Sequence, residues 1–169
     1  MKKSLLVMVA GILAAFPHES FGQSSLWVSG GPTYAFGPTS VGVGTGYNAQ
    51  VAKNFGHWGP AVFRVDALYM QRPYLNSTDR TDAVTASVLL RHSIGPIAPY
   101  ALVGTGLYGD NSWTMYAPGI NAGVGVEATV AHTRVFAESS VHQYLRDARL
   151  SRSAGRTVTL VPISFGFRF

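Results

Sequence analysis

The chain has 169 residues, of which 47% are hydrophobic and only 12% are charged, and its formal net charge at pH 7 is +5. Soluble globular domains carry about 25% charged residues, mostly on their surface, so a chain of this size has too few charges to cover a surface in water. The positive charge is mild and scattered, which argues against a nucleic-acid-binding protein, and the absence of cysteine excludes disulfide bonds and a lipoprotein attachment site.

The first residues have the organisation of a secretory signal peptide. Lys2 and Lys3 form a basic start, residues 4–16 are mostly apolar, and Ser20 and Gly22 place small side chains where a signal peptidase cleaves. About 13 apolar residues fall short of the roughly 20 that a membrane-spanning helix needs, which disfavours a retained anchor. We therefore expect residues 1–22 to be a cleaved signal peptide and residues 23–169 to form a single domain.

After residue 22 the sequence has the period-two alternation of β-strands, because successive strand side chains leave the backbone on opposite sides. The clearest example is residues 119–130, in which Ile120, Val124 and Val126 alternate with Asn121 and Glu127. Turn residues separate eight such segments: residues 26–36, 40–52, 61–70, 83–93, 99–108, 119–130, 134–145 and 157–169. No later stretch approaches the about 18 consecutive apolar residues of a transmembrane helix.

The connections between these segments alternate in length. Residues 54–60, 95–98 and 131–133 form short links, whereas residues 71–82, 109–118 and 146–155 form longer ones; the first link, residues 37–39, is short. Transmembrane β-barrels have short periplasmic turns and longer external loops. The sequence therefore predicts an all-β fold, an eight-stranded antiparallel up-and-down transmembrane β-barrel with both termini in the periplasm.

The last segment alternates to its final residue, with Phe165, Phe167 and Phe169 on one face. In water such a face at a free sheet edge invites pairing with other chains, whereas in a barrel it meets lipid, with aromatic residues near the membrane boundary. Pro162 lies inside this segment and predicts a bulge, because proline lacks a backbone N–H. We expect an outer aromatic girdle to include Tyr69, Tyr74 and Tyr108.

If the apolar set of each strand faces lipid, the other set lines the barrel. An eight-stranded barrel is just wide enough for side chains to fill it, and buried charges must be paired. We therefore predict a plugged interior held by salt bridges, with a gated ion path as the alternative. The expected ion pairs join Asp66, Glu127 and Glu138 to Arg64, Arg91 and Arg168. The other predicted lining residues are Gly42, Gly44, Gly46, Asn48, Gln50, Arg134, Ser140 and His142.

Four stretches carry a resemblance to a known family: APYALVGTGLYG (98–109), GINAGVGVEATV (119–130), FAESSVHQYL (136–145) and VPISFGFRF (161–169). They resemble the small outer-membrane β-barrel domain proteins, the group that includes OmpA, OmpX and OmpW. The resemblance implies the same fold and a location in the Gram-negative outer membrane, as a monomer in contact with lipid and lipopolysaccharide. It also implies that the barrel-assembly machinery recognises the terminal Phe169.

The best candidate for catalysis is Ser140 with His142 and Glu138, which share one face of residues 134–145 and are the parts of an acyl-transfer triad. Same-face neighbours lie about 6.5–7 Å apart along a strand, too far for direct proton transfer, and no oxyanion-hole signature accompanies them. The other histidines are scattered without ligand spacing. We therefore predict no catalytic, cofactor-binding or metal-binding residues and no cofactor.

The predicted function is that of an integral outer-membrane barrel with a structural or surface-interaction role and a plugged, polar lumen. Three alternatives stay open. One is an acyl hydrolase or transferase of outer-leaflet lipids that uses Ser140 and His142. The second is a narrow channel for small solutes, and the third is a soluble lipocalin-like carrier, whose outer face would need more charge than this chain has.

Overall fold

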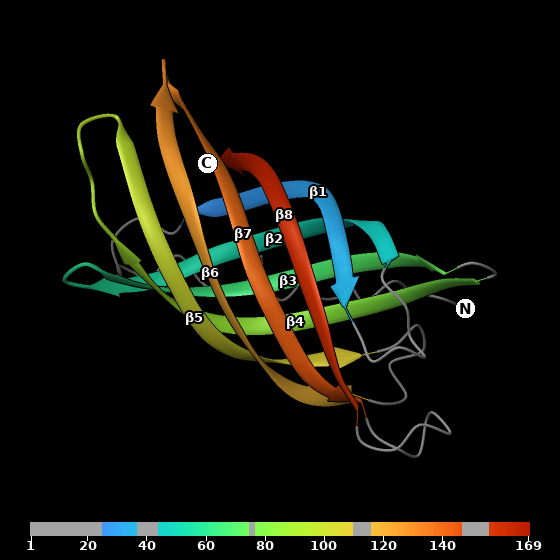
Figure 1. The fold of residues 1–169 in the computed structure, drawn as a ribbon. Helices are drawn as coiled ribbons and strands as arrows, with labels where there is room; N and C mark the ends of the chain where they lie inside the picture. The colour runs from blue at the N-terminus through green and yellow to red at the C-terminus, as the bar shows by residue number, and fades with distance from the viewer. Residues whose placement is uncertain (1–24, 37–43, 75–76, 110–115, 147–155) are drawn as a thin grey trace, which may run out of the picture.

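The computed structural model describes residues 25–36, 44–74, 77–109, 116–146 and 156–169. Each strand pairs with the next in antiparallel order and β1 pairs with β8, so the sheet closes into the predicted eight-stranded barrel. Figure 1 shows the strands wound around a common axis, with β1 beside β8. The strands are β1 (Leu26–Phe36), β2 (Gly44–Trp58), β3 (Ala61–Tyr74), β4 (Ser77–Arg91), β5 (Ile97–Gly109), β6 (Tyr116–Val130), β7 (Thr133–Arg146) and β8 (Arg156–Arg168).

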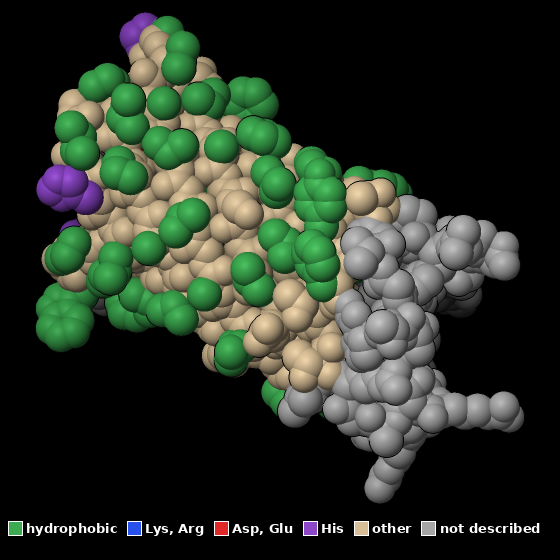
Figure 2. Space-filling model, in the orientation of Figure 1, with side chains coloured by type: hydrophobic (Ala, Val, Ile, Leu, Met, Phe, Trp, Pro, Cys, Tyr) green, Lys and Arg blue, Asp and Glu red, His purple; other side chains and the backbone are tan. Residues whose placement is uncertain are grey.

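Side chains of the described strands alternate between the lumen and the outer surface. On β6, Val124 is 64% exposed whereas Glu127 is 1% exposed. On the described part of the face in Figure 2, apolar side chains are spread over the barrel wall, and neither the blue of Lys and Arg nor the red of Asp and Glu is visible. Soluble monomers rarely expose apolar patches this extensive, so this surface is suited to lipid. Its large exposed residues include Leu26, Phe63, Val103, Ile120, Val141 and Phe165.

No helix in the described ranges is long and apolar enough to cross a membrane.

Several strands are longer than the alternation predicted. β2 continues to Trp58, so the link predicted at residues 54–60 is reduced to a turn at Gly59 and Pro60, where Gly59 adopts a positive φ of 58°. Most of the link predicted at residues 71–82 is strand, because β3 runs to Tyr74 and β4 begins at Ser77. The predicted signal peptide and the first link lie outside the described residues, as do most of the links predicted at residues 109–118 and 146–155.

The bulge predicted at Pro162 is absent. β7 and β8 keep one register on both sides of it, with Ser139 opposite Ile163 and His142 opposite Leu160. The strand therefore accommodates Pro162 by a gap in the β7–β8 pairing, and no extra residue is inserted. A bulge lies in β2 instead, because Asn54 pairs with Arg64 and Gly56 with Phe63, which leaves residue 55 as the extra one.

The seam between β1 and β8 contains a close approach that generates a first prediction. A Cβ atom on Gly31 would lie 2.1 Å from the Ile163 carbonyl oxygen, so Gly31→Ala has to displace the backbone of β8. We expect it to lower the free energy of unfolding by about 1–3 kcal/mol, measured by urea unfolding in detergent micelles and by the temperature at which the compact electrophoretic form is lost.

The matched control is Gly56→Ala, whose Cβ would meet nothing within 4 Å. Equal stability of the two variants would contradict the assignment of a tight closing seam.

Candidate functional site

The inward-facing side chains form layers across the lumen. β7 contributes to each layer in turn, beginning at the β6–β7 turn. Its inward-facing side chains are first a cation, then an aromatic ring, then a carboxylate, and then a hydroxyl and an imidazole: Arg134, Phe136, Glu138, Ser140 and His142. Because strand side chains on one face recur every second residue, neighbouring strands contribute to the same layers. The lumen therefore has a charged centre with a separate charged mouth.

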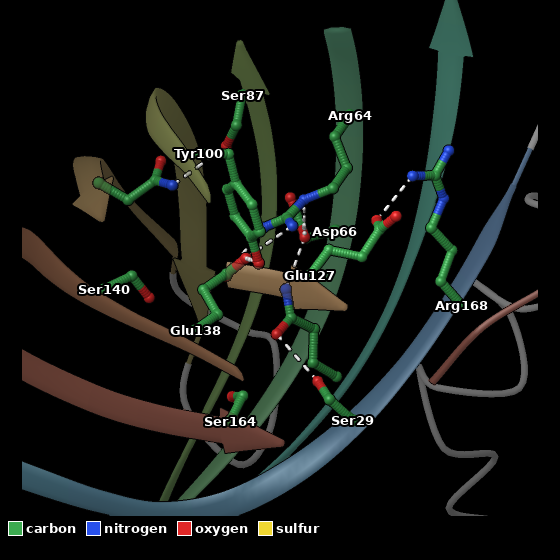
Figure 3. A network of polar contacts seen from close by, with 12 residues as sticks. Ser29, Arg64, Asp66, Ser87, Tyr100, Glu127, Glu138, Ser140, Ser164 and Arg168 are labelled. Carbon is green, nitrogen blue, oxygen red and sulfur yellow. Dashed lines mark hydrogen bonds and ion pairs between the residues drawn. The ribbon is translucent and has the colours of Figure 1, made fainter. Parts of the chain in front are cut away.

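Arg64 is the centre of the middle layer (Figure 3). Its two terminal nitrogens donate to the two oxygens of Glu138 at 2.7 and 2.9 Å. Its Nε lies 2.7 Å from Asp66 Oδ1, in an ion-pair contact that lacks hydrogen-bond alignment. All three side chains are buried, so the pairing takes place without bulk water. A bidentate guanidinium–carboxylate pair is among the strong interactions available to a buried charge.

Neutral donors complete this layer, because one guanidinium faces two carboxylates. Gln50 Nε2 donates to Asp66 Oδ1 at 2.6 Å, and Tyr100 OH donates to Glu138 Oε2 at 2.8 Å. The network thereby joins β2, β3, β5 and β7 across the lumen. It agrees with the predicted salt-bridge plug. The prediction joined three carboxylates to three arginines and did not say which residue pairs with which.

The hydroxyl and imidazole layer lies beyond the middle layer. Ser140 Oγ is 2.9 Å from His142 Nε2, and Tyr108 OH is 2.8 Å from His142 Nδ1. The prediction that Ser140 and His142 are too far apart was wrong, because their side chains lean toward each other along the strand. Tyr108 was also misplaced: it is buried in the lumen, whereas an outer aromatic girdle was predicted for it.

This arrangement does not form a triad for outer-leaflet lipids. Glu138 is held by Arg64 and Tyr100, and Tyr108 occupies the second nitrogen of His142. Ser140 is 5% exposed and His142 is 2% exposed, on the lumen side of a closed wall. The described wall therefore gives an acyl chain in the membrane no approach to the hydroxyl.

The mouth layer is built around Glu127. Arg91 donates to Glu127 Oε1 and Arg168 to Oε2, both at 2.7 Å, and Arg134 Nε lies 4.0 Å from Oε1. Figure 3 shows the Arg168 side chain pointing toward Glu127, with a dashed line between the two. The predicted pairing of Glu127 with lumen arginines is confirmed, but the convergence of three arginines on it was not foreseen.

An aromatic layer separates the mouth from the centre. Two guanidiniums lie over the Trp27 ring, with Arg64 Cζ and Arg168 Cζ each 5.2 Å from its centroid. Phe136 packs edge-on at a centroid distance of 4.7 Å. Stacked guanidiniums gain cation–π attraction, so Trp27 holds both charged layers in place. The sequence analysis did not identify this residue, although its parity on β1 places it inside.

The remaining predicted lining residues are inward where the structure describes them, including Asn48, Gln50 and Arg134. Gly42 lies outside the described residues. On the outer face, Tyr69 lies beside Tyr47 and under Arg80, as a boundary aromatic residue is expected to. The side chain of Tyr74 is outside the described part. Within the described ranges, no three His, Asp or Glu side chains are grouped so that they could hold a metal ion.

No family model and no curated protein matches the chain. Solved structures do: the Neisserial surface protein A (NspA) is similar at a TM-score of 0.66 and 16% identity, over 86% of this chain and 97% of that one. The outer membrane enzyme PagL is similar at a TM-score of 0.56 and 11% identity, over 85% and 98%. The Yersinia pestis attachment invasion locus protein Ail is similar at 0.50 and 14%, over 86% and 97%.

These likenesses show a common fold, that of the small outer-membrane β-barrels. A closed barrel with an apolar outer band and a polar lumen is the architecture of integral proteins of the bacterial outer membrane. The chain is therefore an integral outer-membrane barrel, as its alternation pattern predicted.

The middle layer generates a stability prediction. Arg64→Met leaves the carboxylates of Asp66 and Glu138 buried without their counter-charge, which costs about 3–5 kcal/mol of folding free energy. We expect this loss in urea unfolding followed by tryptophan fluorescence in micelles. Adding Glu138→Gln to Arg64→Met should restore part of it, because the two sites are coupled.

The control is Arg134→Met. The Arg134 side chain is 43% exposed, and its Nε is as far as 4.0 Å from Glu127 Oε1, so the ion pair that is lost is weak. A change below about 1 kcal/mol is expected there. An Arg64→Met variant as stable as the parent would show that the buried pair contributes nothing.

Proposed function

We propose that this protein is a structural outer-membrane anchor with a closed lumen, which presents the segments that follow β1, β3, β5 and β7 at the cell surface. The observation that supports the proposal is the Arg64 network, which spans the lumen with buried ion pairs. A barrel stabilised in this way is a rigid support. Rigid supports commonly carry functional loops.

The orientation follows from the connections. The turns at Gly59 and Pro60, and at Ala131 and His132, are tight and lie at the end where β1 begins and β8 ends. In outer-membrane barrels the short turns face the periplasm. At the opposite end only residues 75 and 76 separate β3 from β4, but the other three segments, 37–43, 110–115 and 147–155, are longer, so this end is assigned to the exterior. Two of the similar structures bear names that refer to a surface protein and to an attachment and invasion locus, which is the class of role proposed here.

The proposed partners are outer-membrane lipid and lipopolysaccharide around the apolar band, and the barrel-assembly machinery through Phe169. The Phe169 side chain is exposed on the outer face, while its backbone exchanges hydrogen bonds with Leu26 at 2.9 and 3.2 Å. Phe169 is therefore both part of the closing seam and accessible from the membrane side. A monomer is the proposed state.

A first test addresses the closed lumen. The purified barrel, with folding verified by its heat-modifiable electrophoretic shift, is expected to give no discrete current steps in planar lipid bilayers, because the Arg64 and Glu127 layers fill the path. A general porin serves as the positive control. Reproducible unitary steps from the folded protein would overturn the closed-lumen proposal and favour the narrow channel.

A second test addresses surface presentation. An epitope inserted within residues 147–155 should bind antibody on intact cells. The same epitope inserted between Ala131 and His132, in the short β6–β7 turn, should bind only after the outer membrane is permeabilised. The reverse pattern would invert the proposed orientation, and binding of neither on intact cells would remove the surface role.

A further inference from the structure

The outer wall of the barrel has a groove over β2, β3, β4 and β5, which follow one another around the sheet (Figure 1). Its volume is about 490 Å³, which is within the range of sites for small molecules. The inward residues beneath it, such as Arg64 and Ser87, are buried. The surface that a ligand meets is therefore formed by outward side chains, which include Phe55, Phe63, Ala86, Val88, Val103 and Thr105.

The shape of the groove follows from the size of these side chains. In the β3–β4–β5 register, Ala86 lies between Val65 and Thr105, next to a bulkier row formed by Phe63, Val88 and Val103. Ala86 contributes only a methyl group at the centre. Thr105 Oγ1 donates to the Gly119 carbonyl oxygen at 2.9 Å, so its hydroxyl is already satisfied within the protein. The groove is therefore an apolar channel in the lipid-facing surface.

A cation lies at the β2 end of the groove. Lys53 is opposite Val65 and Leu26, and because the Leu26 side chain is 41% exposed on the outer surface, Lys53 also faces outward. Its Nζ lies 5.8 Å from the centroid of the Phe55 ring, which lines the groove. A lysine on the lipid face is destabilising to a degree that depends on its depth in the membrane. An anion bound beside Lys53 would lower this cost.

The groove runs from the membrane boundary into the hydrocarbon layer. Lys53 lies near the short-turn end of β2, where Trp58 is 82% exposed, as an aromatic residue at the boundary is expected to be. Thr105, at the other end of the groove, lies more than halfway along β5 from its start at Ile97. Because barrel strands are tilted, a row of paired residues rises through the membrane as it passes from strand to strand. The charged end of the groove is therefore the shallow one.

Lipid tails are as apolar as the groove, so no hydrophobic gain selects one occupant over another. Selection has to come from shape and from the charge of Lys53. A second copy of the barrel matches this charge poorly: among the described side chains, the outward carboxylate that it could offer is Asp82, which Arg80 already binds. A phospholipid matches both features, since its phosphate is anionic and its acyl chain is narrow and flexible.

We propose that the groove binds one phospholipid of the periplasmic leaflet. Its phosphate contacts the Lys53 ammonium, and one acyl chain lies along the groove over Ala86 toward Thr105. An ammonium carries three N–H donors, which suits the anionic oxygens of a phosphodiester. The assignment to the periplasmic leaflet rests on the proposed orientation of the barrel, whereas the site itself does not.

The test uses the folded full barrel in maltoside micelles, which contain no phosphate. Dimyristoyl phosphatidylglycerol is titrated in, and native mass spectrometry counts the lipid molecules that the barrel retains. We expect one lipid to be retained in preference to further ones. Ala86→Phe, which fills the groove, and Lys53→Gln, which removes the charge, should each weaken its binding by about tenfold or more. Dimyristoylglycerol, which lacks the phosphate, should also bind more weakly.

The matched controls are Ala137→Phe and Lys53→Arg, and both should retain the lipid as the parent does. Ala137 lies on the outer face of β7, opposite the exposed Val126 and Phe165, away from the groove. Equal retention by the parent and Ala86→Phe would indicate a non-specific lipid coat and overturn the site. Equal retention of the diacylglycerol would overturn the phosphate contact, and a dimer that Ala86→Phe abolishes would assign the groove to a second copy.

A measurement on the parent protein keeps the test decisive if a variant does not fold. In a sample with labelled methyl groups, the titration should give saturable NMR shifts for Ala86 and Val103 and smaller ones for Ala137 and Val141, on the other side of the barrel. Equal shifts on both sides would overturn the proposal. Because micelles have no leaflets, the outcome is independent of the proposed orientation and surface role.

Discussion

The structure depends on one constraint, which is that no water is available in the hydrocarbon layer to satisfy backbone N–H and C=O groups. An open sheet would leave two strand edges unpaired there, at several kcal/mol for each exposed group. Pairing of β1 with β8 removes both edges, and the reciprocal hydrogen bonds between Leu26 and Phe169 continue the seam to the last residue. Closure in turn divides every strand into an outer and an inner face, so the alternation of side chains follows from the same constraint.

Closure with eight strands also determines what the lumen contains. The interior is just wide enough for side chains to fill it, so a charge placed there has to be neutralised by neighbours instead of water. Arg64 meets this requirement by contacting Glu138 and Asp66 at once, and Gln50 and Tyr100 donate further hydrogen bonds to the same two carboxylates. Replacing such a buried network by apolar residues is often neutral for stability. Its value here lies in joining strands that are not neighbours in the sheet.

The alternation predicted the strand number, the bounds of β1 and the inward set of charges, because parity along a strand is a local property of the sequence. It did not predict the strand extensions between Gln71 and Asp82, since residues beyond the hydrocarbon layer have no reason to alternate in polarity. Nor did it predict the contact of Ser140 with His142, because backbone spacing does not specify rotamers. The convergence of three arginines on Glu127 depends on the relative registers of β4, β6, β7 and β8, which are properties of the closed sheet.

The two charged layers differ in a way that their surroundings explain. In the centre, one guanidinium is shared by two carboxylates, and neutral donors supply the remaining hydrogen bonds in a fully enclosed space. At the mouth, three guanidiniums share one carboxylate, and Arg134 is partly exposed to water. An excess charge is far less costly where solvent or a counter-ion can reach it. The enclosed centre therefore requires matched charges, whereas the mouth tolerates an excess of positive charge because water reaches it.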